Sequence, residues 1–488
     1  MRDPVEVGVG EHRAVGGGEA ERWHLHDRSI PDRIDRRGIY DPDVNRFHVA
    51  AAALAVGLVL GDGSVVVLAL PAVYREYGAE VSDVAWVITA FNLAVALAAV
   101  PAARLATRRG ATLICTAGLA LFAVASLACA LAPSLAVLVA ARAVQGIGGA
   151  AAVTAALELL PAIVGSERRA TRIWAIAGGT GAALGPAVGG LLTELISWQA
   201  IFLAQVPLAL APIPLLARVR SRREPSAPGR PHLAANVALL LLSAGLAAAL
   251  FLLVLLLIEG WQLSPITAAI VVSALPAATI AAAPLERRIG TPRVRAVAGA
   301  ILAGGGLAGL GLLPGARAVW TLPPQILIGA GLALALGALT ETALAGRSEM
   351  AIHGGTTIAA RHAGVVLGLV LLTPIFIGDL NRQRDRAEQA AAAAFLDARV
   401  SLTTQAAVAT AVGDELAASP GRLPNVKAIF ARADVRREDR SAVAQLERVF
   451  QDQLDRAATS SFSRSFLLAA ALALLALIPA LRGREIEL

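Results

Sequence analysis

The chain has 488 residues, of which 56% are hydrophobic and 16% charged, and its mean hydropathy is +0.66. Ordinary soluble proteins carry about 25% charged residues, so this composition excludes a water-soluble globular domain and equally a disordered, collagen-like or coiled-coil chain. The formal net charge of +7 does not indicate nucleic-acid binding, because the arginines are scattered between apolar blocks instead of gathered on one face.

Residues 1–46 are polar, with acids and arginines interleaved, and we expect them to form a solvated, disordered tail. His24 and His26 lie in this region without further ligand residues and do not indicate a metal site. The first apolar block starts at Phe47, later than the apolar part of a cleaved signal peptide would. It therefore predicts a retained membrane span.

Twelve apolar blocks follow along the chain, each close to the length of about 20 residues that a helix needs to cross a bilayer. The expected limits are 47–72, 84–103, 111–132, 135–160, 171–193, 199–217, 234–258, 264–284, 295–314, 319–345, 358–379 and 463–481. The predicted fold class is an all-α integral membrane protein with about 12 transmembrane helices. Cys115 and Cys129 lie in the third block, about 21 Å apart along a helix, and are too far apart for a disulfide.

Arginines are concentrated in the short connections that follow even-numbered blocks. These residues are Arg104, Arg108, Arg109, Arg168, Arg169, Arg172, Arg218, Arg220, Arg222, Arg223, Arg230, Arg287, Arg288, Arg293, Arg295, Arg347 and Arg361. The opposite short connections hold only Arg75 and Arg317. The positive-inside rule assigns the first set to the cytoplasm. Both termini are then expected on the cytoplasmic side of the plasma membrane.

Two of these basic turns have similar sequences, Leu105–Gly110 after the second block and Leu285–Gly290 after the eighth. The similarity predicts parallel repeats, with two pseudo-symmetric six-helix bundles. The expected divisions are a first bundle at 47–217, a cytoplasmic basic linker at 218–233, spans seven to eleven of the second bundle at 234–380, and the last span with the C-terminus at 461–488.

The polar segment 381–460 separates the last two spans, and the predicted topology puts it outside the cytoplasm. Apolar residues recur at helical spacing in its second part, namely at Val443, Leu446, Val449, Phe450 and Leu454. We expect a helical hairpin with its turn near Pro420–Pro424. It is either a solvated spacer or a small helical cap.

Two charged residues lie inside predicted spans, where a charge is expensive and usually functional. Asp62 is in the first span and Arg142 is in the fourth, at nearly the same depth. If both face one cavity they can pair, and the proton affinity of the carboxylate then depends on which side admits water. We interpret them as a proton-coupling pair. A static ion pair that joins two helices is the alternative.

The fifth span is rich in glycine and contains Pro186. Gly181, Gly185 and Gly189 recur every fourth residue, with Gly190 next to the last, and form a smooth face that another helix can approach closely. Proline weakens the backbone hydrogen bonding of the same stretch. This pattern favours a flexible gate over tight packing alone.

Three further polar residues are candidates for a substrate cavity: Gln145 one turn from Arg142, Asn92 in the second span, and Glu341 near the cytoplasmic end of the tenth. For Glu341, an ordinary solvated position is the favoured explanation. The sequence has no nucleophile–base pattern, phosphate-binding loop or zinc motif. An enzyme, a cofactor and a bound metal are therefore not expected.

Several of these residues lie in motifs that resemble the drug:proton antiporters of the major facilitator superfamily. Asp-Gly-Ser-Val-Val-Val-Leu-Ala-Leu-Pro at 62–71 is similar to the first-span motif of that family, and Arg-Ala-Val-Gln-Gly-Ile-Gly-Gly-Ala at 142–150 is similar to its fourth-span motif. Residues 181–190 resemble the antiporter motif of the fifth span, and residues 198–207 continue it. The resemblance implies two bundles around a central cavity that opens alternately to each side.

The loop after the second span departs from the family pattern Gly-x-Leu-Ala-Asp-Arg-x-Gly-Arg. Ala103 stands at the first glycine and Thr107 at the aspartate, whereas Arg108 and Gly110 match the pattern. The charge contact attributed to that aspartate cannot form here.

The function that this resemblance implies is proton-coupled export of small amphipathic compounds. The proton gradient supplies the energy, and the partners are the lipid bilayer, protons and a small-molecule substrate, with no nucleic acid. We expect a monomer. A proton symporter or uniporter of a small metabolite is an alternative, as is a membrane receptor or assembly factor that uses 381–460 and transports nothing.

Overall fold

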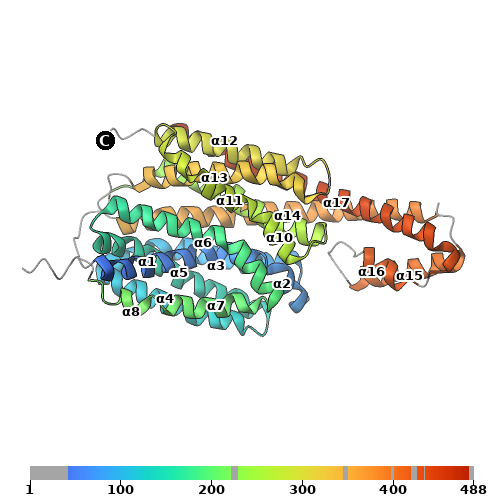
Figure 1. The fold of residues 1–488 in the computed structure, drawn as a ribbon, viewed down its shortest axis with the longest axis horizontal. Helices are drawn as coiled ribbons and strands as arrows, with labels where there is room; N and C mark the ends of the chain where they lie inside the picture. The colour runs from blue at the N-terminus through green and yellow to red at the C-terminus, as the bar shows by residue number, and fades with distance from the viewer. Residues whose placement is uncertain are drawn as a thin grey trace, which may run out of the picture. The chain divides into compact units, whose positions relative to one another are not determined.

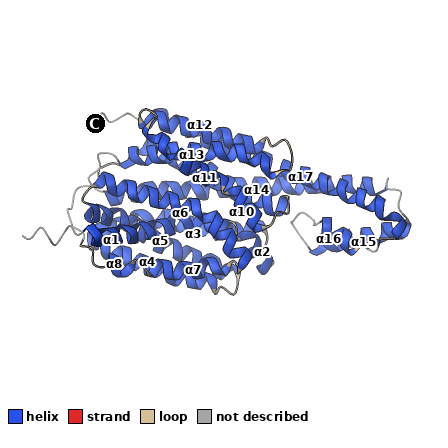
Figure 2. Cartoon of the chain, in the orientation of Figure 1, coloured by secondary structure: helices blue, strands red, loops and turns tan. Residues whose placement is uncertain are grey.

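The structure is a computed structural model that describes residues 42–220, 229–344, 350–396, 401–418, 426–433 and 435–482. All regular elements in these ranges are helical (Figure 2), as the sequence predicts. Residues Met1–Val44 and Asn45–Leu488 form separate units. Most of the predicted tail, the middle of the predicted linker and the predicted turn near Pro420–Pro424 lie outside the described residues.

The helices follow each other with short connections, and Figure 1 shows their order. Those of the first half are α1 (Pro42–Val67), α2 (Leu70–Tyr77), α3 (Val81–Arg109), α4 (Ala111–Ala130), α5 (Leu135–Val164), α6 (Glu167–Leu195), α7 (Gln199–Leu210) and α8 (Ile213–Leu216). Those of the second half are α9 (Leu233–Leu255), α10 (Pro265–Val272), α11 (Ala274–Ala282), α12 (Pro292–Gly311), α13 (Leu322–Leu344), α14 (Met350–Leu396), α15 (Leu402–Ala418), α16 (Val426–Arg432), α17 (Arg440–Leu475) and α18 (Leu477–Arg482).

Within the described ranges, 12 helical stretches are long and apolar enough to cross a membrane, which agrees with the twelve predicted spans. Proline interrupts four spans that the sequence analysis treats as continuous. The first is broken before Pro71, the sixth at Pro212, the eighth before Pro276 and the twelfth before Pro479. Proline has no backbone N–H to continue the helical hydrogen-bond ladder, so each break follows from the residue at that place.

The last two spans differ most from their predicted limits. The predicted span 358–379 is part of α14, a helix of 47 residues, and the predicted span 463–481 starts within α17, which already begins at Arg440. Hydropathy marks where a helix becomes polar, not where it ends. No proline or glycine interrupts 379–396 or 440–462, so both helices continue through polar sequence.

The halves contact each other through a few helices. In the first half α5 packs on α3 and α4, and in the second half α13 packs on α11 and α12 while α14 packs on α9 and α17. Between the halves, α14 packs against α3 and α5, and α6 packs against α10 and α11. Residues of α3, α5, α6, α10, α11 and α14 therefore form most of the contact between the halves.

Glycines bring α1 and α6 into direct backbone contact. A Cβ atom on Gly61 would lie 2.7 Å from the backbone of Gly181, and one on Gly181 would overlap the carbonyl of Gly57. Cβ atoms on Gly185 and Gly189 would likewise overlap α1. The predicted smooth face of the fifth span therefore packs on the helix that carries Asp62.

A small apolar core holds the polar segment together. Val443, Leu446 and Phe450 of α17 are buried against α15 and α16, whereas Val449 is 40% exposed. Beside this core, Asp439 Oδ2 accepts hydrogen bonds from the hydroxyls of Ser401 at 2.5 Å and Thr404 at 2.6 Å. These bonds join the start of α15 to the start of α17 across a long stretch of chain.

We predict that Asp439→Asn loosens this junction. The two hydroxyl bonds lower the pKa of Asp439 below its ordinary value of 3.8, so the carboxylate stabilises the folded segment above that value and the contribution is lost as the pH falls through the lowered pKa. Hydrogen exchange is expected to speed up in 401–418 and 440–450 of the variant. Exchange at the wild-type rate would contradict the prediction, and Glu438→Gln, 69% exposed beside it, is the control.

Candidate functional site

Asp62 and Arg142 form an ion pair inside the first half. Arg142 Nη1 lies 2.6 Å from Asp62 Oδ2, and both side chains are 0% exposed. The aspartate comes from the last quarter of α1 and the arginine from the first third of α5. The structure thus brings together the two in-span charges that the sequence singles out.

Three polar side chains surround the ion pair. Arg142 Nη1 donates to Gln145 Oε1 at 2.5 Å, and Gln205 Nε2 donates to Asp62 Oδ1 at 2.8 Å. Gln145 Nε2 donates in turn to Gln205 Oε1 and to Ser126 Oγ, both at 2.7 Å. The two amides therefore close a ring of hydrogen bonds around the charges, and a change at one member affects all of them.

Aromatic rings and a backbone carbonyl complete the surroundings of the arginine. Its Cζ atom lies 4.3 Å from the ring centroid of Phe91 and 5.6 Å from that of Phe202. Such cation–π contacts are strongest where water is excluded. Arg142 Nε also donates to Val87 O on α3 at 3.0 Å, whereas Nη2 is buried without a hydrogen-bond partner among the described residues. One donor of the guanidinium is therefore left over in this conformation.

A histidine of the second half reaches this site. Asn92 Nδ2 donates to Ile88 O at 2.8 Å, which leaves Asn92 Oδ1 to accept from Nδ1 of His362 at 2.7 Å. The His362 ring also meets Phe91 edge-on, with centroids 6.4 Å apart. Phe91 therefore contacts both the arginine and a side chain of α14. The sequence analysis missed His362 and Gln205, because neither carries a charge that hydropathy would mark.

Glu341 lies outside the ion-pair network. Glu341 accepts a hydrogen bond from Arg295 Nη2 at 2.9 Å and is 52% exposed, in the second half. Gln145 and Asn92 are both buried in this conformation. Among the motif glycines, Gly190 faces α10, where its Cβ would lie 2.5 Å from Ala269 Cβ. Pro186 is buried inside α6, which continues past it.

Residues 52–376 match the sequence profile of the Major Facilitator Superfamily. The chain belongs to this superfamily. Three curated relatives are similar to part of it. The Tetracenomycin C resistance and export protein of Streptomyces glaucescens is 32% identical over 36% of this chain and 34% of its own length. The Methylenomycin A resistance protein of Bacillus subtilis is 34% identical over 35% of this chain and 37% of its own length. The Multidrug efflux pump LfrA of Mycolicibacterium smegmatis is 36% identical over 33% of this chain and 33% of its own length.

The alignments thus span about a third of the length of these curated relatives. A solved structure covers more of the chain. The crystal structure of a bacterial homolog to the human lysosomal transporter Spinster, in an inward-facing and unoccupied conformation, superposes with a TM-score of 0.61 over 92% of this chain and 100% of that chain. At 15% identity this likeness shows the fold alone. It agrees with the predicted arrangement of two helical bundles.

The loop motif of the superfamily lacks its acid here, and the structure shows what Thr107 does instead. Its hydroxyl donates to Arg104 O at 2.9 Å within the same helix. Gly110 ends α3 with φ 104°, and Gly290 in the related turn has φ 24°. Both turns therefore use backbone conformations that favour glycine. Arg108 is exposed.

The halves of this superfamily member touch at both ends. At the end with the basic turns, a Cβ atom on Gly355 of α14 would lie 2.9 Å from Ala99 O and from Ala103 Cβ of α3. At the opposite end, Arg75 Nη2 on α2 lies 2.6 Å from Glu259 Oε1, at the end of the seventh span. In this conformation the halves are therefore in contact at both ends.

We predict an asymmetric effect of removing each charge of the ion pair. Asp62→Leu leaves a guanidinium that stays charged without its partner, and the free energy of unfolding should fall by about 3–5 kcal/mol. Arg142→Met should cost less, because a carboxyl group that has lost its partner can take up a proton.

The double variant Asp62→Leu/Arg142→Met tests whether the two charges are energetically coupled. It should recover part of the loss of Asp62→Leu, because no unpaired charge remains buried. The measurement is thermal unfolding of the three variants in lipid nanodiscs, followed by tryptophan fluorescence. Strictly additive losses would contradict the prediction.

Proposed function

We propose that this chain is a proton-coupled exporter of small amphipathic compounds. The observation that carries the proposal is the fully buried Asp62–Arg142 ion pair, held by side chains that can exchange partners. The names of the relatives, which refer to resistance, export and efflux, support the direction of transport. Twelve apolar helices are consistent with a transporter of the plasma membrane.

In this proposal Asp62 is the proton carrier. A proton that arrives from outside binds Asp62 Oδ2 and removes the charge that faces Arg142. The guanidinium then keeps its bonds to Gln145 and to the Val87 carbonyl, and its attraction to α1 is lost. Release of the proton toward the cytoplasm restores the pair. Each cycle thus moves one proton inward and weakens the α1–α5 contact once.

Alternating access requires that contacts between the halves break at one end at a time. Following the positive-inside rule, we assign the end with the basic turns to the cytoplasm. The Gly355 contact then closes the cytoplasmic end and the Arg75–Glu259 pair closes the outer end. The hydrogen bond between His362 and Asn92 joins the halves close to the aspartate, so movement of α3 on loss of the ion pair reaches α14 directly.

Asp62→Asn is expected to abolish proton-driven efflux, because an amide of the same size cannot bind and release a proton. Substrate counterflow needs no net proton movement and should persist, which distinguishes lost coupling from lost folding. Both are measured in proteoliposomes with an imposed pH gradient. Asp83→Asn, at an exposed position in the first turn of α3, is the control. Full proton-driven efflux by Asp62→Asn would refute the proposed coupling.

Charge reversal at the outer contact should open that end. Arg75→Glu places two acids opposite each other, and Arg75 is half exposed, so the expected effect is about 1 kcal/mol, or about a fivefold change in populations. Arg75→Glu/Glu259→Arg should restore closure. Spin labels at Asp83 and Thr267 report the separation, since both positions are exposed and flank the contact. An unchanged distance distribution in the single variant would contradict the assignment.

A further inference from the structure

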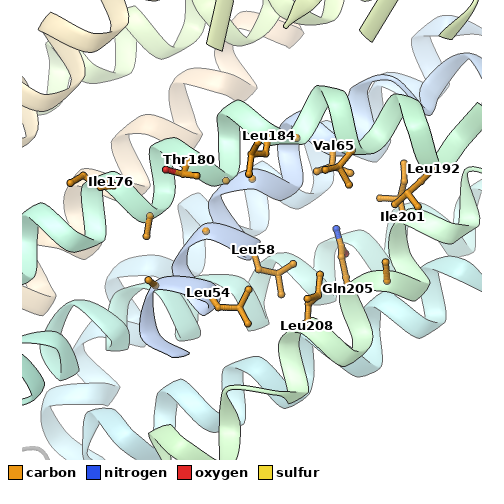
Figure 3. Close-up of a pocket in the computed structure, with 18 of the residues that line it drawn as sticks. Leu54, Leu58, Val65, Ile176, Thr180, Leu184, Leu192, Ile201, Gln205 and Leu208 are labelled. Carbon is orange, nitrogen blue, oxygen red and sulfur yellow. The ribbon is translucent and has the colours of Figure 1, made fainter. Parts of the chain in front are cut away.

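A groove opens on the side of the first half, between α6 and α7, with α1 at its floor (Figure 3). Its volume is about 520 Å³, within the range of pockets that hold small organic molecules. The groove is distinct from the contacts between the halves, because all the residues that line it belong to α1, α6 and α7. It lies within the span of these helices that would cross the bilayer.

The floor of the groove is deep because glycines form it. Gly57 and Gly61 of α1 face Gly181 of α6, so no side chain fills the space above their contact. Leucines stand on the rim from each helix, among them Leu54, Leu184 and Leu208 (Figure 3). Leu184 is 54% exposed and Leu208 is 42% exposed. In a membrane these rim residues face hydrocarbon, so an apolar molecule enters from the bilayer without crossing water.

The groove ends at the ion-pair network. Gln205 lines it and is only 4% exposed, and in Figure 3 its amide points from α7 toward α1. The same amide nitrogen donates to Asp62 Oδ1 at 2.8 Å. A molecule in the groove is therefore separated from the carboxylate by one side chain. The remaining polar side chain in the lining, Thr180, is exposed at the rim.

We propose that this groove binds a lipid-soluble amphipathic compound taken directly from the bilayer, with its apolar body against α1, α6 and α7 and its polar end at Gln205. The inference rests on the proposed export function and adds a binding site to it. A lipid acyl chain would fit the apolar walls but has no group for the amide at the inner end. An amphipathic compound satisfies both parts of the lining, and its polar end competes with Asp62 for Gln205.

The occupant is tested by fluorescence quenching in nanodiscs of brominated phosphatidylcholine. Leu208→Trp places a reporter on the rim, and Leu121→Trp on α4 is a control of similar exposure outside the groove, 38% against 42%. Lidocaine, a lipid-soluble amphipathic compound whose amide carbonyl can accept from Gln205, should displace lipid and relieve quenching of Leu208→Trp saturably. It should leave the quenching of Leu121→Trp unchanged.

A second experiment fills the groove with a bulky side chain. Ala204→Trp in the Leu208→Trp background should remove the response to lidocaine, because the indole occupies the space between α1 and α7. Ala117→Trp, on an exposed face of α4, should preserve it. Quenching that lidocaine does not relieve in Leu208→Trp would mean that the groove holds acyl chains only, and this result would overturn the proposal. Equal relief in both reporters would overturn it as well.

Efflux measurements distinguish failure of the proposed groove site from failure of the proposed export function. Ala204→Trp alone should lower efflux of lidocaine by at least about tenfold and leave that of methyl viologen, a more water-soluble dication, within about twofold. Equal losses for both compounds would indicate a structural defect and contradict a separate route. If the wild-type protein exports neither compound under a proton gradient, the proposed function fails, while the quenching measurement still decides whether the groove binds.

Discussion

Two opposite charges without exposed surface persist in a protein only when their remaining polar atoms are also paired. The Asp62–Arg142 pair recruits residues of five helices for this purpose: α1 and α5 supply the charges, α3 a carbonyl, α4 a hydroxyl and α7 an amide. The positions of these helices relative to one another are therefore set largely by one polar centre. Within the part of the chain that the structure describes, Arg142 Nη2 has no hydrogen-bond partner, so the network retains donor groups that could bond a different partner.

The same centre is connected to the second half through neutral groups. Phe91 stacks against the guanidinium and touches His362, and the Asn92 amide next to it accepts from that histidine. A charge that moved between the halves would have to be desolvated again at each step. Aromatic and amide contacts avoid this penalty, so a change at Asp62 can alter the packing between α3 and α14 while the charges stay within one bundle.

The sequence predicts the charged part of this site but not its neutral part. Asp62 and Arg142 are visible because charges are rare inside apolar blocks, and the spacing of Gly181, Gly185 and Gly189 predicts a close helix approach that the structure contains. Gln205 and His362 depend on which helices become neighbours. Their partners lie 143 and 270 residues away along the chain, and no local pattern specifies such pairs. Similarly, hydropathy finds the spans but not the extent of α14 and α17, since a helix does not end where its polarity changes.

The glycine contact between α1 and α6 has two consequences that are usually considered separately. It removes side chains from the interface, so that α1 approaches closely enough to hold Asp62 in the network, and it leaves a groove on the outer side of the same contact. Widening that contact would disturb both the carboxylate and the groove. In the proposed mechanism, a ligand in the groove and a proton on Asp62 both act on the hydrogen bond from Gln205 Nε2 to Asp62 Oδ1. Coupling of this kind would be reciprocal: a ligand that draws Gln205 away removes a hydrogen-bond donor from the carboxylate, and proton uptake as proposed would in turn free Gln205 for the ligand.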